Sequence, residues 1–149
     1  MKIKNFALLS LFAVLCVAGC KKTTSSAESP KRVFFIAPKD GDTVPATFKV
    51  EFGVEGMTLQ PAGEAIDDKT SGHHHLLIDY AKGYNDSGEI VLKDDKNIHF
   101  GKGESNTLLT LSPGPHKLTL QFADGAHRSY GKELSTSINV IVQAPQSNP

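Results

Sequence analysis

Residues 48–54 read Phe-Lys-Val-Glu-Phe-Gly-Val, with an apolar side chain at every second position. Successive side chains of a β-strand point to opposite faces, so this pattern predicts a strand with one buried face. The same alternation recurs over residues 117–122 (Lys-Leu-Thr-Leu-Gln-Phe) and in Ile138, Val140 and Val142. No stretch shows the apolar stripe of a helix, whose period is about 3.6 residues. The folded part of the chain is therefore predicted to be all-β.

The other strands are predicted from the same alternation and from the turn signals between them. Together the expected strands cover 32–37, 48–54, 73–80, the short segments 90–92 and 98–100, 107–111, 116–123 and 138–142. About seven short strands indicate an antiparallel β-sandwich, immunoglobulin-like in its arrangement. Two connections, Glu55–Ser71 and Ala81–Asn97, are longer than turns require, and long connections in a compact β domain are often functional. Both flank the strand expected from residue 73.

The first nineteen residues resemble a bacterial lipoprotein signal peptide. Two lysines form a positive start, and apolar residues 6–18 are too few for the roughly 20 that a membrane-spanning helix needs. Val17-Ala18-Gly19-Cys20 resembles the lipobox, which implies cleavage before Cys20 and acylation of that residue, with palmitate among its lipids. Lys21 stands where an Asp would be the inner-membrane retention signal. The resemblance thus implies a cell-envelope lipoprotein on the periplasmic face, and it favours the outer membrane over the inner.

The rest of the chain divides into three segments. Residues 20–31 hold the acylated Cys20 and a polar stretch that is predicted to stay unfolded. The eleven residues that follow Cys20 reach about 18 Å on average, so they would tether the domain close to the membrane surface. Residues 32–142 form one β domain of ordinary size, and residues 143–149 form a flexible tail.

Charge and cysteine content exclude several classes of protein. The chain has 16 basic and 16 acidic residues; removal of Lys2 and Lys4 with the signal peptide leaves 14 basic residues and a formal charge of about −2. Because no basic stripe is present, we expect no nucleic-acid partner. The two cysteines, Cys16 and Cys20, lie within or at the end of the signal segment. The β domain therefore has neither a disulfide nor a thiolate ligand.

Three of the six histidines are consecutive, in Gly72-His73-His74-His75. On a strand His73 and His75 share one face, about 7 Å apart along the chain, and His74 points to the other. Two imidazoles at that spacing can converge on one metal ion with metal–nitrogen distances of about 2.0–2.1 Å. His74 shares its face with Leu76 and Ile78, so it is predicted to be a neutral core residue held by backbone hydrogen bonds.

Strand geometry selects the partners of this pair. His116 begins a predicted strand and His127 follows its end, so about 24 Å separates them and they cannot share an ion. In an immunoglobulin-like sandwich the strand that carries the triplet runs antiparallel to residues 116–123, and it therefore begins near His127. We predict His73, His75 and His127 as metal ligands, with His99 as a fourth; His116 is expected to be structural.

Imidazole ligands suit Zn(II), Cu(II) or Ni(II), whereas a soft Cu(I) site is disfavoured without thiolates. Zinc and copper(II) are the candidate cofactors, although the sequence alone does not identify one. Water or a carboxylate such as Asp79 or Asp124 would complete the coordination. Asp79 shares the face of His73 and His75 and could instead support a ligand by a hydrogen bond. The alternative is that the histidines serve packing, hydrogen bonding or a response to pH.

Short motifs run through nearly the whole domain, and together they suggest a family. They are Arg32-Val33-Phe34-Phe35, Pro38-Lys39-Asp40-Gly41, Val54-Glu55-Gly56-Met57, Pro61-Ala62-Gly63, Gly72-His73-His74-His75-Leu76-Leu77-Ile78-Asp79, His99-Phe100-Gly101-Lys102-Gly103 and Leu111-Ser112-Pro113-Gly114-Pro115-His116-Lys117-Leu118. With them the chain resembles the bacterial secreted domain-of-unknown-function family 4399. The resemblance implies a secreted or periplasmic β domain without an established activity. The chain departs from the family pattern at Tyr130, where members often have a second histidine.

Three functions are compatible with these residues. The first is a lipid-anchored periplasmic module that binds a transition metal for sensing, storage or delivery. The second is a non-catalytic adhesion or envelope-interaction module with structural histidines, whose protein partners the sequence does not specify. The third is an enzyme, but the chain has no Gly-x-Ser-x-Gly elbow, no His-Glu-x-x-His motif and no cysteine nucleophile in its domain. Only a metal-dependent hydrolase or a copper oxidase built from the same histidines would fit.

Overall fold

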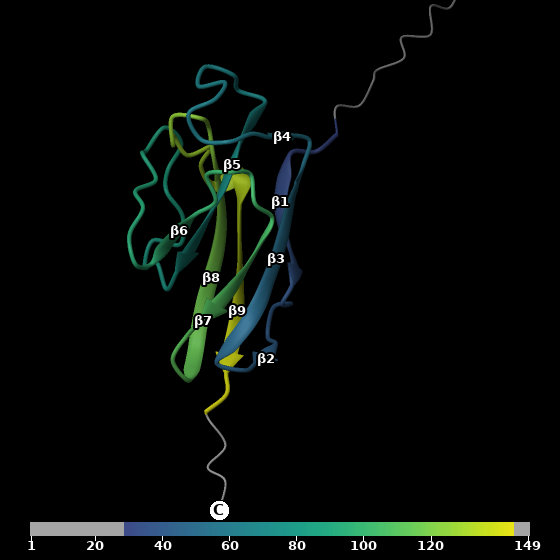
Figure 1. Cartoon of the computed structure of the whole chain (residues 1–149), viewed down its shortest axis with the longest axis vertical. Helices are drawn as coiled ribbons and strands as arrows, with labels where there is room; N and C mark the ends of the chain where they lie inside the picture. Colours follow the sequence, from purple (N-terminus) through teal and green to yellow (C-terminus); the bar gives the residue numbers. More distant parts are fainter. Residues whose placement is uncertain (1–28, 145–149) are drawn as a thin grey trace, which may run out of the picture.

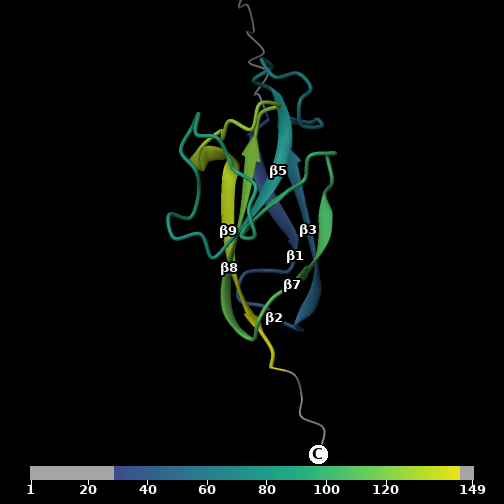
Figure 2. The ribbon, with the colours of Figure 1, turned by 60° about the vertical axis from the view of Figure 1, so that its left-hand side comes forward.

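A computed structural model describes residues 29–144 of the chain and shows two β-sheets packed face to face (Figures 1 and 2). The smaller sheet has the order β1-β3-β7, formed by β1 (Arg32–Ala37), β3 (Thr47–Glu55) and β7 (Asn106–Thr110). The larger sheet has the order β2-β9-β8-β5-β4, formed by β2 (Thr43–Val44), β9 (Ser135–Val142), β8 (Gly114–Ala123), β5 (Ser71–Ile78) and β4 (Thr58–Leu59), and β6 (Asn97–His99) also pairs with β5. In Figure 2, β7 lies beside β3 on one side, and β9 lies beside β8 on the other. The predicted signal peptide, Cys20 and most of the tether lie outside the described residues.

The alternation that predicts β3 is the one that builds the core. Phe48, Val50 and Phe52 are buried, whereas Lys49 is exposed to solvent. The facing sheet contributes its own buried apolar residues, which are Leu76, Leu118, Leu120, Phe122, Val140 and Val142. Each such side chain contributes about 1.5–3 kcal/mol by leaving water, so the two inner faces hold the sandwich together.

The strand order confirms the predicted immunoglobulin-like sandwich. Strands β1, β3 and β7 correspond to A, B and E of that fold, and β9, β8 and β5 correspond to G, F and C. β5 pairs antiparallel with β8, with His73 opposite Ala123 and Ile78 opposite Leu118. The pairing is not antiparallel throughout, because the two-residue strands β2 and β4 lie parallel to β9 and β5. The start of β5 therefore lies at the end of β8, as expected from the fold class.

Some predicted strand limits need correction. β5 ends at Ile78 and not at Tyr80, because Asp79 has a φ of 53°, a left-handed conformation that leaves the strand path. Residues 90–92 form no strand; Ile90 makes a single bridge with Arg128. The connection Glu55–Ser71 is also not all loop, since it contains β4.

The loop between β4 and β5 binds to the two other loops at the same end of the sandwich. The N–H of Ala62 donates to the carbonyl of Gly101 at 2.9 Å, and the N–H of Gly63 donates to the carbonyl of Gly125 at 2.8 Å. The contact at Gly125 is close: a Cβ there would lie 2.0 Å from the carbonyl oxygen of Glu64. Only glycine fits this approach. The loop thus joins the segment after β6 to the turn after β8.

The part of the chain that the structure describes has one short 3-10 helix, η1 (Lys132–Leu134). None of its helices is long and apolar enough to cross a membrane.

Candidate metal centre

Two strands bring three histidines together. His73 and His75 alternate on β5 and point to the same face, as predicted, and neither exposes any surface to solvent. β6 pairs antiparallel with β5 in a register that puts His99 directly opposite His75. Directly opposed side chains on neighbouring strands lie about 5 Å apart, so this register alone places the His99 ring beside the pair.

The fourth histidine comes from the turn after β8. His127 has a φ of 63°, in the left-handed region. The buried carboxylate of Asp124 holds the turn: it accepts from the N–H groups of Ala126 and Arg128 at 2.9 Å each, and from Lys69 Nζ at 3.0 Å. Burial raises the pKa of Asp124, but these bonds hold the pKa below its usual value. Asp124 is thus occupied with shaping the turn and does not complete a metal shell.

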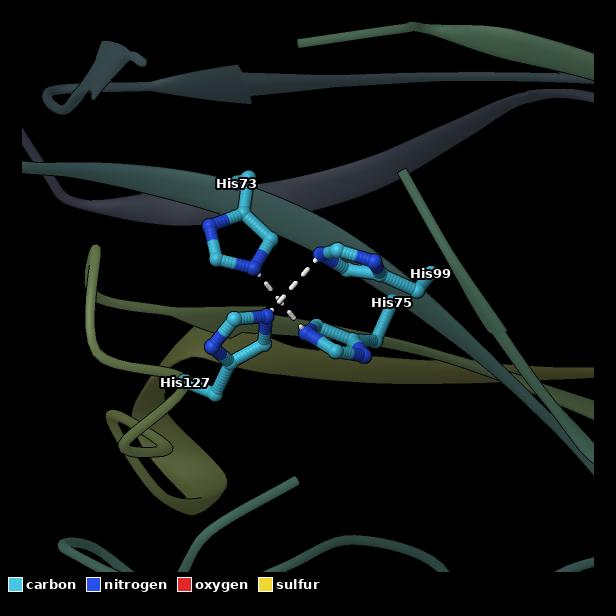
Figure 3. A group of neighbouring side chains, drawn as sticks. All are labelled: His73, His75, His99 and His127. Carbon is cyan, nitrogen blue, oxygen red and sulfur yellow. Dashed lines mark hydrogen bonds between the residues drawn. The ribbon is translucent and has the colours of Figure 1, made fainter. Parts of the chain in front are cut away.

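The ring nitrogens of these four residues converge on one point (Figure 3). We call His73, His75, His99 and His127 the histidine cluster. Nε2 of His73 lies 3.2 Å from Nε2 of His75, and Nε2 of His127 lies 3.1 Å from Nε2 of His99. One ligand nitrogen from each ring lies within 4.8 Å of all the others. A tetrahedral ion with bonds of about 2.0–2.1 Å needs nitrogens about 3.3–3.4 Å apart, so the four rings are close to a metal-binding geometry.

A hydrogen bond outside the cluster fixes the tautomer of His75. Its Nδ1 lies 3.2 Å from Oδ1 of Asn97, and the Asn97 amide Nδ2 donates to the carbonyl of Leu92. Because the Asn97 amide nitrogen donates to a carbonyl, the amide oxygen is the atom that faces His75. That oxygen can only accept a hydrogen bond, so Nδ1 of His75 must carry the proton that is donated to it. Nε2 of His75 then presents a lone pair to the centre of the cluster. No motif or periodic pattern in the sequence indicates this role for Asn97.

Replacing Asn97 by leucine should lower zinc affinity about 10- to 100-fold, because outer partners of ligating histidines have effects of that size. The amide would no longer select the Nδ1–H tautomer of His75. Isothermal titration measures the effect, and Lys96→Leu, at the exposed neighbouring position, is the matched control. Equal affinities for the two variants would contradict the role of Asn97.

Burial favours the uncharged form of His73, His75 and His99. It lowers the pKa of His73 to about 4, with smaller effects from His127 and His99, and it lowers the pKa of His75 to about 3. Burial also lowers the pKa of His99. A neutral imidazole is the form that binds metal, so these rings need not lose a proton to bind an ion at pH 7.

Gly101 is a second residue whose role the sequence did not show. A Cβ at this position would lie 2.3 Å from Cε1 and 2.7 Å from Nε2 of His99. The ring of His99 therefore rests against the glycine backbone. Gly101 is part of the motif His99-Phe100-Gly101. From the sequence alone, however, the segment Gly101-Lys102-Gly103 predicts only an ordinary tight turn.

We expect Gly101→Ala to weaken zinc binding about 10-fold or more, since the new methyl group must push the His99 ring out of the cluster. The fold should persist, because Gly101 lies in a half-exposed loop. Zinc titration and circular dichroism test the two parts, with Lys102→Ala as the neighbouring control. Wild-type affinity in Gly101→Ala would show that the position of His99 is not needed.

His74 points away from the cluster into the core, as predicted. Its ring centroid lies 5.0 Å from those of Phe52 and Phe122, and burial lowers its pKa to about 3. The expected backbone hydrogen bonds are not formed: neither ring nitrogen has a partner among residues 29–144. His74 is held by the aromatic rings around it.

His116 and Asp79 lie apart from the cluster. His116 Nδ1 lies 2.7 Å from Asp79 Oδ2, and its Nε2 lies 2.9 Å from the carbonyl of Ser112. The Lys117 N–H donates to the other Asp79 oxygen at 2.8 Å. His116 is thus structural, as predicted, but Asp79 bonds to His116 and not to a cluster histidine. The reason is its left-handed backbone, which turns the residue out of β5 after Ile78.

The pair formed by His116 and Asp79 should make stability depend on pH. Burial lowers the pKa of His116, but the bonds to Asp79 and Ser112 raise it above its usual value. The stabilisation is complete below the unfolded pKa of about 6.5 and is lost as pH rises through the raised pKa. Burial raises the pKa of Asp79, but its bonds hold it below the usual value, so its contribution is lost only in strong acid.

His116→Gln should therefore destabilise the domain more at about pH 5.5 than at about pH 8.5. Urea unfolding of both proteins in chelator measures the difference, and the other histidines cancel in the comparison. An equal or larger effect at the higher pH would contradict the ion pair.

Comparison with known proteins gives a family and one structural likeness. A family model described as "Domain of unknown function (DUF4399)" matches residues 50–143, which include all four cluster histidines. No curated protein matches the sequence. The X-ray structure of the endo-beta-1,4-mannanase from Thermotoga petrophila is similar over 77% of this chain, with 18% identity and a TM-score of 0.46. The match covers 20% of that enzyme, so the chain spans about a fifth of its length.

Proposed function

The chain belongs to the DUF4399 family, and we propose that it binds one transition-metal ion, zinc or copper(II), through the histidine cluster. The observation that carries the proposal is the convergence of four imidazole nitrogens, two pairs of which are 3.2 and 3.1 Å apart. Imidazole is a preferred ligand of both ions. Two strands and a turn supply the four rings, so separate parts of the chain meet at this point.

Purely structural histidines would be bonded differently. A buried neutral imidazole is satisfied when one nitrogen donates and the other accepts, usually with backbone or carboxylate groups. In the cluster the nitrogens face one another, so each pair needs one ring to donate and one to accept. A metal ion would use all the inward lone pairs at once, which favours binding over a packing role.

The experiment is metal analysis of protein purified without a histidine tag. After exposure to zinc or copper(II) and dialysis, we expect one ion per chain. A calcium-treated sample is the control, since calcium takes oxygen ligands. Protein that retains no more zinc or copper than the dialysis buffer contains would contradict the proposal.

We further propose that the domain works at a membrane surface, for storage or delivery of the ion. The support is the resemblance of Val17-Ala18-Gly19-Cys20 to a lipobox. Acylated Cys20 would keep the cluster within a short tether of the lipid. In cell fractionation, replacing residues 1–20 by a cleavable signal peptide without a lipobox should move the protein from the membrane to the soluble envelope fraction. Retention of this variant in the membrane would contradict the anchor and leave metal binding untouched.

A further inference from the structure

The arrangement of the four nitrogens distinguishes a tetrahedral from a planar site. In a square-planar set with bonds of about 2.0 Å, neighbouring nitrogens are about 2.8 Å apart and opposite ones about 4.0 Å. The pairs His73–His75 and His99–His127 share no member, so in a square they would be either the two diagonals or two opposite sides. Diagonals of 3.2 and 3.1 Å would place the ion about 1.6 Å from each nitrogen, which is shorter than any metal–imidazole bond.

Opposite sides of a square are also excluded. Such sides are parallel, and parallel lines do not cross in any view. In Figure 3 the line between His73 and His75 crosses the line between His99 and His127. The four nitrogens then lie at the corners of a tetrahedron, with the His73–His75 pair and the His99–His127 pair as its opposite edges. The four nitrogens therefore lie closer to a tetrahedral arrangement than to a square-planar one.

The surroundings hold the rings in this arrangement. His75 and His99 are fixed by the register of β5 and β6, and His75 is also held by Asn97. Gly101 packs against Cε1 and Nε2 of the His99 ring. On the remaining side, the turn with His127 is fixed by the buried Asp124. Flattening the cluster would require these contacts to break.

Four protein nitrogens also complete a tetrahedral shell. Catalytic zinc sites have three protein ligands and leave the fourth position to water or substrate, whereas structural sites have four. His73 and His75 are fully buried, and His99 and His127 are half-buried. No position in such a shell is left for a substrate.

Building on the metal binding proposed above, we propose that the cluster is a closed, tetrahedral zinc(II) site that holds its ion without catalysis. Zinc(II) has no geometric preference from its d-electrons and accepts this arrangement, whereas copper(II) favours a tetragonal one. The ion would link β5, β6 and the turn after β8. Of the two roles proposed above, this assigns the site to storage of zinc and not to its delivery, and it separates the protein from copper oxidases and zinc hydrolases.

Cobalt(II) is the probe for this geometry, because its tetrahedral complexes absorb visible light far more strongly than its six-coordinate complexes. The sample is the full chain in detergent, with Cys16→Ser and Cys20→Ser to remove thiolates. We expect an intense visible spectrum that saturates at one cobalt(II) per chain and is abolished by one equivalent of zinc. Azide should not alter the spectrum, because no position is open. His116→Gln should behave identically.

Two kinds of failure are distinguishable. Binding of one cobalt(II) with a weak, six-coordinate spectrum, or a spectrum that changes with azide, would overturn the closed tetrahedral site and leave metal binding intact. If the protein retains none of zinc(II), copper(II) and cobalt(II), both the proposed function and this inference are overturned.

Discussion

Replacing His73 and His75 together by glutamine should abolish metal binding, from one ion per chain to none. The substitutions remove two of four ligands and leave His99 and His127 without the pair that faces them. Loss of an outer partner alone costs about 10- to 100-fold in affinity, so loss of two direct ligands should exceed about 100-fold. Isothermal titration with zinc measures this, and His116→Gln, outside the cluster, is the matched control.

A second variant tests the cluster independently, because substitution of two buried residues can itself prevent folding. His127→Asn changes a half-buried turn residue, and asparagine tolerates the left-handed conformation found there. It should retain the fold and bind zinc at least about 10-fold more weakly. Wild-type affinity in both proteins would refute the cluster as the binding site.

Zinc should stabilise the folded domain strongly. If zinc binds only the folded state, a free concentration about 100-fold above the dissociation constant raises the free energy of unfolding by about 2.7 kcal/mol. The physical reason is that the ion joins two strands and a turn that are far apart in the sequence. Thermal unfolding should shift upward with zinc and return to its starting value with chelator.

Calcium and the protein with both His73→Gln and His75→Gln are the controls for this shift. Calcium should not shift the unfolding temperature of the wild type, since this ion prefers oxygen ligands. Zinc should not shift the unfolding temperature of the double variant, since that protein lacks the pair His73 and His75. A zinc-dependent shift of equal size in the double variant would place the stabilising ion elsewhere on the surface.

The local part of the site could be predicted from the sequence because a strand has a fixed period of two. That period separated His73 and His75 from His74, and the antiparallel pairing of β5 with β8 placed His127 near them and His116 away. These inferences depend only on backbone geometry and fold class.

The supporting residues could not be predicted because they depend on tertiary contacts. β6 has three residues, and only its register with β5 puts His99 opposite His75. The role of Asn97 depends on its bond to the Leu92 carbonyl, in a connection with no periodic pattern. The alternation of residues along the strand puts Asp79 on the face of His73 and His75. Its left-handed φ turns the residue toward His116 instead.

Diffraction from crystals grown with zinc, recorded on both sides of the zinc absorption edge, tests the central claim most directly. We expect one strong anomalous peak at the centre of the histidine cluster, about 2.0–2.1 Å from four Nε2 atoms. A map without a peak at that point, or with zinc only on surface carboxylates, would contradict the claim that these four histidines hold a metal ion.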